Sequence, residues 1–154
     1  MEKDYDTLYF MVRHPEVKRM RQYRQHRNAD TYSHCCHVTL KSIRIIRCMR
    51  LNVDMEAVVK GAMLHDFYLY DATSVGSIHW RHGWTHPKTA LANAEKVFCL
   101  STKEKNIIYS HMWPINITHI PKCREAVIVN IADKMCAVEE IFLWGRRNAG
   151  ISAF

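Results

Sequence analysis

The chain is poor in glycine and proline and has no long apolar run. Its 154 residues include only 5 glycines and 4 prolines, too few for a loop-rich β-sandwich or a low-complexity linker. No apolar stretch reaches the roughly 20 residues that a membrane-spanning helix needs. The first residues, MEKDYDTLYFMVRH, lack the apolar core of a secretory signal. Because a domain has about 150 residues, the length predicts one domain over 1–154. The absence of a membrane span and of a signal segment predicts a soluble cytoplasmic protein with no membrane partner.

Recognisable cysteine patterns are also missing. The six cysteines form one adjacent pair and four single positions within apolar stretches: Cys35, Cys36, Cys48, Cys99, Cys123 and Cys136. Without a CxxC spacing, neither a zinc ribbon nor a thioredoxin-like redox pair is indicated. Because free cysteine packs as a small apolar side chain, and no secretion signal is present, we expect reduced thiols in the core.

Acidic residues are outnumbered by basic ones, 15 to 22, which gives a formal charge of +7 with the ten histidines neutral. Such an excess favours anionic partners, among them phosphorylated small molecules and nucleic acid. Much of it lies early, in a basic segment over 15–28 that we expect to be helical from Pro15 onwards. The solvated face of a surface helix is the ordinary interpretation of such a segment, and a nucleic-acid-binding surface is the alternative.

Sustained alternation of apolar and polar residues is absent, and apolar residues recur at helical spacing instead. This pattern predicts an all-α domain, a compact bundle of about six to seven helices with its core over about 30–143. We expect helices over 15–28 and 34–51, from the Asp54 cap to His65, from Pro87 to Phe98, from the Ser101–Glu104 capping box to His111, and from Pro121 to Leu143. Residues 67–85, aromatic and irregular, are expected to form a loop, with room for one short helix within it.

Helical spacing separates the histidines by the face that each one shares. His34 shares a face with Val38 and Met49, which places it at the start of a buried stripe, whereas His37 shares a face with Lys41 and is expected in solvent. The same test places four histidines and two aspartates inward: His34, His65, Asp66, His86, His111 and Asp133. One such residue is ordinarily satisfied by a core hydrogen bond. Six together are hard to satisfy except around metal, because imidazole and carboxylate are the usual ligands of divalent transition ions.

These six residues, in order and context, resemble the HD-domain superfamily of metal-dependent phosphohydrolases. Its H…HD…D motif matches His34, the His65-Asp66 pair and Asp133. His86 and His111 match two further histidines of members that hold two metals. The surrounding segments are YSHCCHV, GAMLHDFYLYD, HGWTHPKTAL, SHMWP and IADKMCA, and the resemblance covers about 30–140.

Three departures separate the chain from known branches of that superfamily. The HD pair is followed by Phe67-Tyr68 rather than the Gly-Lys of the cyclic-di-GMP phosphodiesterases, and Met112-Trp113-Pro114 stands where they carry a GYP sequence. No glutamate follows Asp66 by three residues, where the bacterial deoxynucleotidase branch places an acid. The substrate is therefore not carried over from either branch.

The resemblance implies a phosphohydrolase with a metal-bound hydroxide at a dinuclear site that holds divalent transition ions such as Fe, Mn, Co, Ni or Zn. Its small phosphorylated substrate would be a phosphomonoester or phosphodiester, nucleotides included. Asp66 is suited to bridge the two ions, because a carboxylate has two oxygens. Lys134 either offsets phosphate charge or is a plain surface lysine, and His82 and Lys88 flank His86 where they can meet phosphate.

Other aromatic residues and histidines have ordinary structural interpretations, in the core or at the surface. Four aromatic side chains either wall a pocket or, as is more common, pack the core: Tyr70, Trp80, Trp84 and Trp113. Four histidines are expected at the surface: His14, His26, His79 and His119.

Two alternatives to a hydrolase remain open from the residues. Some HD-fold proteins, such as inositol oxygenase, use a di-iron site of this H…HD…H…H…D type for oxidation. A non-catalytic module would instead keep the ligands and bind a nucleotide, or bind nucleic acid through the basic segment over 15–28. The complete six-ligand set argues against that module, because pure binding has no need of an open dinuclear centre.

Overall fold

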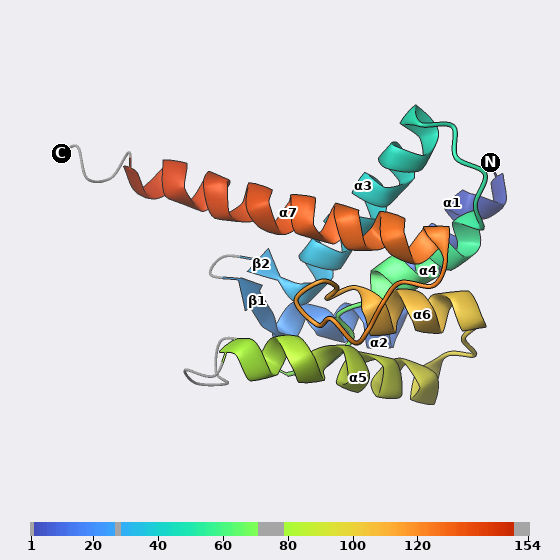
Figure 1. The fold of residues 1–154 in the computed structure, drawn as a ribbon, viewed down its shortest axis with the longest axis horizontal. Helices are drawn as coiled ribbons and strands as arrows, with labels where there is room; N and C mark the ends of the chain where they lie inside the picture. The colour runs from blue at the N-terminus through green and yellow to red at the C-terminus, as the bar shows by residue number, and fades with distance from the viewer. Residues whose placement is uncertain (1, 27–28, 71–78, 150–154) are drawn as a thin grey trace.

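The structure, a computed structural model, describes residues 2–26, 29–70 and 79–149, without the side chains of 2–5, 25–26, 29, 79–84 and 141–149. Its elements in order are α1 (Glu2–Arg13), α2 (Pro15–Lys18), the 3-10 turn η1 (Arg19–Gln22), β1 (Arg24–His26), β2 (Ala29–Asp30), α3 (Thr31–Cys48), α4 (Met55–Leu64), α5 (His79–Val97), α6 (Thr102–Ser110) and α7 (Arg124–Ala149). The predicted all-α class is confirmed for this part of the chain, apart from one short antiparallel pair, β1–β2 (Figure 1). None of these helices is both long and apolar enough to cross a membrane.

Helix starts follow the side chains that cap them. Asp54 accepts a hydrogen bond from the amide of Ala57 at 3.1 Å and begins α4. Ser101 and Glu104 form the predicted capping box at the start of α6. Asp30 caps α3 by accepting from the amide of Ser33 at 2.8 Å, so α3 begins a few residues before the expected boundary. These caps satisfy amides that the first turn of a helix leaves without a partner.

The helix predicted over 15–28 is wrong beyond its first turns. Val17 and Met20 are buried and support only α2 and η1. The backbone then becomes extended at Tyr23, whose carbonyl accepts from both the amide and the hydroxyl of Thr31, at 3.0 and 3.1 Å. This contact turns the chain into the β1–β2 pair. Residues 24–28, RQHRN, offer no further apolar side chain that could anchor a longer helix.

Helix α5 begins at His79 rather than near Pro87, so residues 79–85 belong to this long helix and not to the predicted loop or to a separate short helix within it. Pro87 therefore lies inside a helix and not in its first turn. A proline there removes one backbone hydrogen bond, but its side chain is buried and the helix continues on both sides. The consequence is that His86 projects from the middle of a helix.

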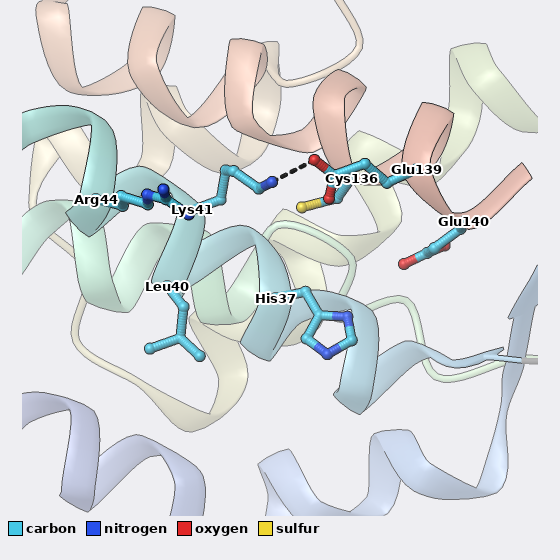
Figure 2. A pocket seen from close by; sticks show the side chains of 7 residues that line it. All are labelled: His37, Leu40, Lys41, Arg44, Cys136, Glu139 and Glu140. Carbon is cyan, nitrogen blue, oxygen red and sulfur yellow. Dashed lines mark hydrogen bonds and ion pairs between the residues drawn. The ribbon is translucent and has the colours of Figure 1, made fainter. Parts of the chain in front are cut away.

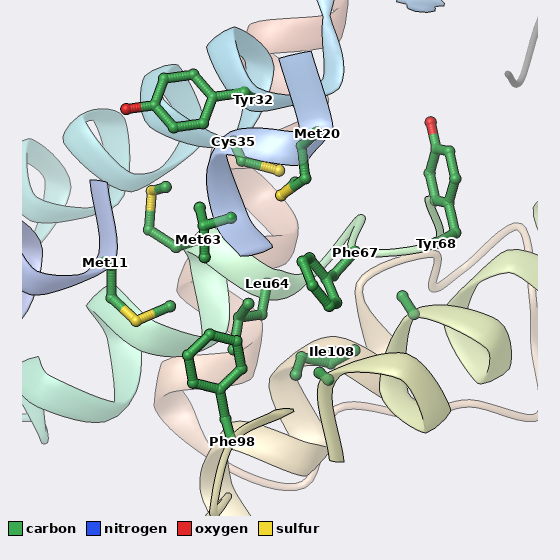
Figure 3. Close-up of a cluster of buried hydrophobic side chains, with 13 residues drawn as sticks. Met11, Met20, Tyr32, Cys35, Met63, Leu64, Phe67, Tyr68, Phe98 and Ile108 are labelled. Carbon is green, nitrogen blue, oxygen red and sulfur yellow. The ribbon is translucent and has the colours of Figure 1, made fainter. Parts of the chain in front are cut away.

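Helix α4 is the centre of the packing. It contacts α1, α3, α5, α6 and α7, and every residue from Ala57 to Leu64 except Lys60 is buried. One apolar cluster joins α4 to the N-terminal elements through Met11, Met20, Met63 and Leu64, with Phe98 at the end of α5 (Figure 3). A second cluster joins α4 to α3, α6 and α7 through Val38, Val58, Ile107 and Val129.

Several apolar side chains that the sequence suggests for the core are exposed. Met49 is 65% exposed because α3 ends at Cys48, and Arg50 then takes a left-handed backbone conformation, φ 52°, that turns the chain away. All six cysteines are free, as expected, but Cys48 and Cys99 are exposed rather than in the core, since both lie at helix ends. Over residues 124–140, where its side chains are described, helix α7 likewise buries one face, and Ile131 is 48% exposed on the other.

Candidate metal centre

Two groups of side chains that can ligate metal lie together in the core. The first group comprises His34, His65 and Asp133, and the second group comprises Asp66, His86 and His111. Within each group the ligand atoms, one per residue, all lie within 4.8 Å of one another. All six residues are buried, and the most exposed of them, Asp133, shows 9% of its surface. The expectation that these residues point inward is confirmed, while their binding of metal stays a prediction.

Five helices deliver the six side chains. His34 lies in the second turn of α3, His86 in the middle of α5 and Asp133 on the buried face of α7. The His65-Asp66 pair directly follows the last residue of α4, and His111 directly follows α6. Positions just after a helix end let adjacent residues point in different directions, which is how His65 and Asp66 reach different groups.

Short distances join the members of each group. In the first group, Nε2 of His34 lies 3.0 Å and Nε2 of His65 lies 3.6 Å from Oδ1 of Asp133. In the second group, Nε2 of His86 and Nε2 of His111 each lie 3.3 Å from Oδ1 of Asp66 and 2.7 Å from each other. Asp66 also reaches the first group, since its Oδ2 lies 3.4 Å from Nε2 of His65.

Backbone carbonyls fix the orientation of two imidazoles. Nδ1 of His65 donates to the carbonyl of Ala62 at 2.7 Å, and Nδ1 of His111 donates to the carbonyl of Ile108 at 2.8 Å. A carbonyl only accepts, so Nδ1 carries the proton and the lone pair of each neutral ring lies on Nε2, towards the other ligands. Nε2 of His65 is buried without a hydrogen-bond partner. Burial lowers the pKa of His65, but the charge of Asp66 outweighs it and raises that pKa well above its ordinary value, so a cation bound at Nε2 would replace a proton there.

In both groups, buried carboxylates lie next to imidazole bases. Burial raises the pKa of Asp66, but the charge of His65 outweighs it and, with the neighbouring imidazoles of His111 and His86, holds that pKa well below its usual range. Burial lowers the pKa of His34, but its hydrogen bonds to Asp133 and Glu140 raise it to about 9. Buried carboxylates therefore stay ionised and need positive partners. Divalent cations are one kind of partner that these carboxylates can take.

One contact of the centre was not anticipated from the sequence. Oε1 of Glu140 lies 3.0 Å from Nδ1 of His34, on the side of the ring opposite Asp133. Glu140 follows Asp133 by seven residues, or two helical turns, so the two carboxylates share a face of α7. That spacing is the sequence signal that identifies it, once Asp133 is placed inward.

The three residues predicted to assist with phosphate are placed differently. Nζ of Lys134 donates to the carbonyl of His111 at 2.9 Å and lies 4.0 Å from Oδ2 of Asp133. Burial lowers the pKa of Lys134. Lys88 is exposed, and burial together with the charge of Lys88 lowers the pKa of His119. The side chain of His82 lies outside the described residues. His37, as predicted, is exposed.

Two of the histidines predicted at the surface are covered instead. His119 is 4% exposed, because the chain after α6 folds back and stacks its ring on Tyr109 at 3.8 Å, beside the Asn116 amide. His14 is half-buried, with its ring 4.7 Å from that of Phe98. Polar neighbours in the sequence suggest an exposed side chain, and they do not show that the chain folds back and covers it. The side chains of His26 and His79 lie outside the described residues.

Aromatic side chains line one side of the second group. The ring of Tyr68, which is buried, meets His86 edge-on at 5.6 Å and lies 4.7 Å from the ring of Tyr70. Trp113 is 39% exposed, so it does not pack the core. The side chains of Trp80 and Trp84 lie outside the described residues.

The arrangement offers two clusters of nitrogen and oxygen ligand atoms, and Asp66 of the second group also approaches the first. Each group supplies two imidazoles and one carboxylate, a donor set that suits divalent transition ions. Among known proteins, no family model matches the chain, and neither a curated protein nor a solved structure is found to be similar to it.

Proposed function

We propose that the protein is a metal-dependent phosphohydrolase of the HD-domain type that uses two divalent transition-metal ions. One observation carries the proposal: Asp66 directs Oδ1 to His86 and His111 at 3.3 Å each, and Oδ2 to His65 at 3.4 Å. A carboxylate shared between two ligand groups is the feature that a two-metal centre requires and that one ion would not need.

Different residues of the chain would hold each of the two ions. The first group would hold one ion through His34, His65 and Asp133, and the second group would hold the other through His86 and His111, with Asp66 joining them. Two bound ions supply a water nucleophile at neutral pH and positive charge for the phosphoryl oxygens of a substrate. The substrate class is a phosphomonoester or phosphodiester, with nucleotides among the candidates.

Lys134 is the cation of this proposal that is best placed to meet phosphate. It is only partly buried, with 35% of its side chain exposed, and its Nζ lies 4.0 Å from Asp133. The ammonium can therefore leave its carbonyl partner and donate to a phosphate oxygen at the edge of the first group. Lys88 and His82 stay secondary predictions for phosphate contacts.

Hydrolysis of simple phosphoesters tests the proposal. The purified protein, loaded in turn with Mn²⁺, Co²⁺, Ni²⁺ or Fe²⁺, is assayed with p-nitrophenyl phosphate and with bis(p-nitrophenyl) phosphate. We expect turnover that is lost on exhaustive chelation and restored by metal, and that Asp66→Asn abolishes. Thiol-blocking reagents should leave it unchanged, because no cysteine has a role in it.

Two results would overturn the phosphohydrolase. The first is hydrolysis that survives exhaustive chelation, which removes the metal from the mechanism. The second is a protein that holds two iron ions and consumes oxygen but turns over no phosphoester, which would favour the oxygenase alternative.

A further inference from the structure

Glu140 stands behind one of the proposed ligands, outside both groups. Its Oε1 lies 3.0 Å from Nδ1 of His34, and only 16% of its side chain is exposed. On the other side of the same ring, Nε2 of His34 lies 3.0 Å from Asp133. The imidazole, itself fully buried, is thus held between two carboxylates of α7.

This arrangement differs from that of the neighbouring histidines. Nδ1 of His65 and Nδ1 of His111 each donate to a backbone carbonyl three residues earlier in the chain. A carbonyl fixes the tautomer, as a carboxylate does, but a carboxylate adds a full negative charge and makes the ligating nitrogen a stronger electron donor. Of the three histidines His34, His65 and His111, it is His34, in the first group, whose Nδ1 contacts a charged carboxylate.

We infer that Glu140 is a positioning residue for His34, and that it makes the first group the tighter of the two metal sites. The inference rests on the proposed metal centre. Glu140 accepts the Nδ1–H hydrogen bond, so that Nε2 faces Asp133 and can exchange its proton for a bound cation. It also adds negative charge behind the first group, where it strengthens the hold on a dication.

The neighbour of Glu140 provides a matched control. Both glutamates line a groove between α3 and α7, together with His37, Leu40, Lys41, Arg44 and Cys136 (Figure 2). Glu139 is 53% exposed at its side chain and pairs with Lys41 rather than with a proposed ligand. Substitution of Glu139 removes the same charge from the same groove without touching His34.

Cobalt binding to the metal-free protein tests the inference. Co²⁺ is titrated into the protein in the presence of a competing chelator. The visible absorption of bound cobalt measures the affinity of each of the two equivalents, and it does so without an activity assay. We expect Glu140→Gln, which keeps an acceptor but loses the charge, to weaken the tighter equivalent by about 10-fold, and Glu140→Ala by up to about 100-fold. The weaker equivalent, and both equivalents in Glu139→Gln, should match the wild type.

The outcomes separate this inference from the proposed function. Wild-type protein that binds no cobalt overturns the metal centre itself. Wild-type protein that binds two equivalents, with Glu140→Gln and Glu140→Ala binding the tighter one equally well, overturns only the role of Glu140. Thermal unfolding of the metal-free variants shows whether each is folded. If Glu140→Ala does not fold, cobalt binding to Glu140→Gln, which keeps the shape of the side chain, tests the role of Glu140.

Discussion

His65 and Asp66 are adjacent in the chain, and their side chains meet with 3.4 Å between Nε2 and Oδ2. The other oxygen of Asp66 turns away, to Nε2 of His111 at 3.3 Å. The pair therefore connects the first group to the second group directly after the end of α4. Four other helices, α3, α5, α6 and α7, bring the remaining four ligands to this junction, so the centre depends on the packing of the whole domain.

The two histidines of the HCCH segment should differ in importance. His34 is buried in the first group, whereas His37, three residues later, is exposed. We expect His34→Ala to lower kcat/KM for an aryl phosphate by at least about 100-fold, which is roughly 2.7 kcal/mol of transition-state stabilisation. His37→Ala should retain most of the activity. Equal losses in the two variants would show that His34 has no special role.

The placement of His34 and its partners was predictable because burial on a helix follows from local spacing. Val38 and His34 share the buried face of α3, and the caps of α4 and α6 lie at the predicted residues. The spacing from Asp133 places Glu140 on the same face of α7, but its contact with His34 could not be predicted from spacing. It depends on how α3 packs on α7, between residues 106 positions apart. Likewise, nothing local to Pro87 shows that α5 extends towards His79.

Lys134 should contribute to substrate binding and not to metal binding. Its ammonium lies 4.0 Å from Asp133 but cannot ligate a cation. We expect Lys134→Met to lower kcat/KM for a phosphoester by about 10- to 100-fold, about 1.4–2.7 kcal/mol, mainly through a higher KM, while the metal content stays at that of the wild type. Lys122→Met, at an exposed lysine, is the control. A loss of bound metal in Lys134→Met would contradict this assignment.

The contact between α4 and α6 should be sensitive to a single methyl group. A Cβ added at Gly61 would lie 2.7–2.9 Å from three side-chain atoms of Ile107. Such overpacking costs about 1–3 kcal/mol, more than the gain of up to about 1 kcal/mol from replacing glycine within a helix. We expect Gly61→Ala to lower the free energy of unfolding in urea, measured on the metal-free protein.

The matched test of that contact reduces the obstacle. An Ile107→Ala background removes Cδ1 and Cγ2 and leaves Cβ, at 2.9 Å from the added methyl, as the one close atom of that side chain, so Gly61→Ala should cost less stability there than in the wild type. A Gly61→Ala protein as stable as the wild type would show that α4 and α6 are not so closely packed.

Glu125 should make stability depend on pH in the acid range. Burial raises the pKa of Glu125, but hydrogen bonds from the Asp54 amide and from Lys103 outweigh it and hold the pKa at about 2, below its ordinary value of 4.5. A carboxyl whose pKa is lower in the folded state stabilises the fold above the unfolded pKa and loses that effect as the pH falls towards the folded pKa.

The stability difference between the wild type and Glu125→Gln measures this effect. It should be constant from pH 7 down to about pH 5.5 and shrink between pH 4.5 and the onset of acid unfolding. Glu56→Gln, at an exposed glutamate in the first turn of α4, controls for the loss of one charge. A difference that grows as the pH falls would contradict the assigned contacts.

The metal content of the purified protein tests the central claim most directly. After reconstitution with excess Mn²⁺ or Co²⁺ and removal of free metal, elemental analysis should find two ions per wild-type chain and one per chain of His86→Ala, because the first group remains whole in that variant. A wild-type content that never exceeds one ion, or a His86→Ala content equal to that of the wild type, would contradict the two-metal centre.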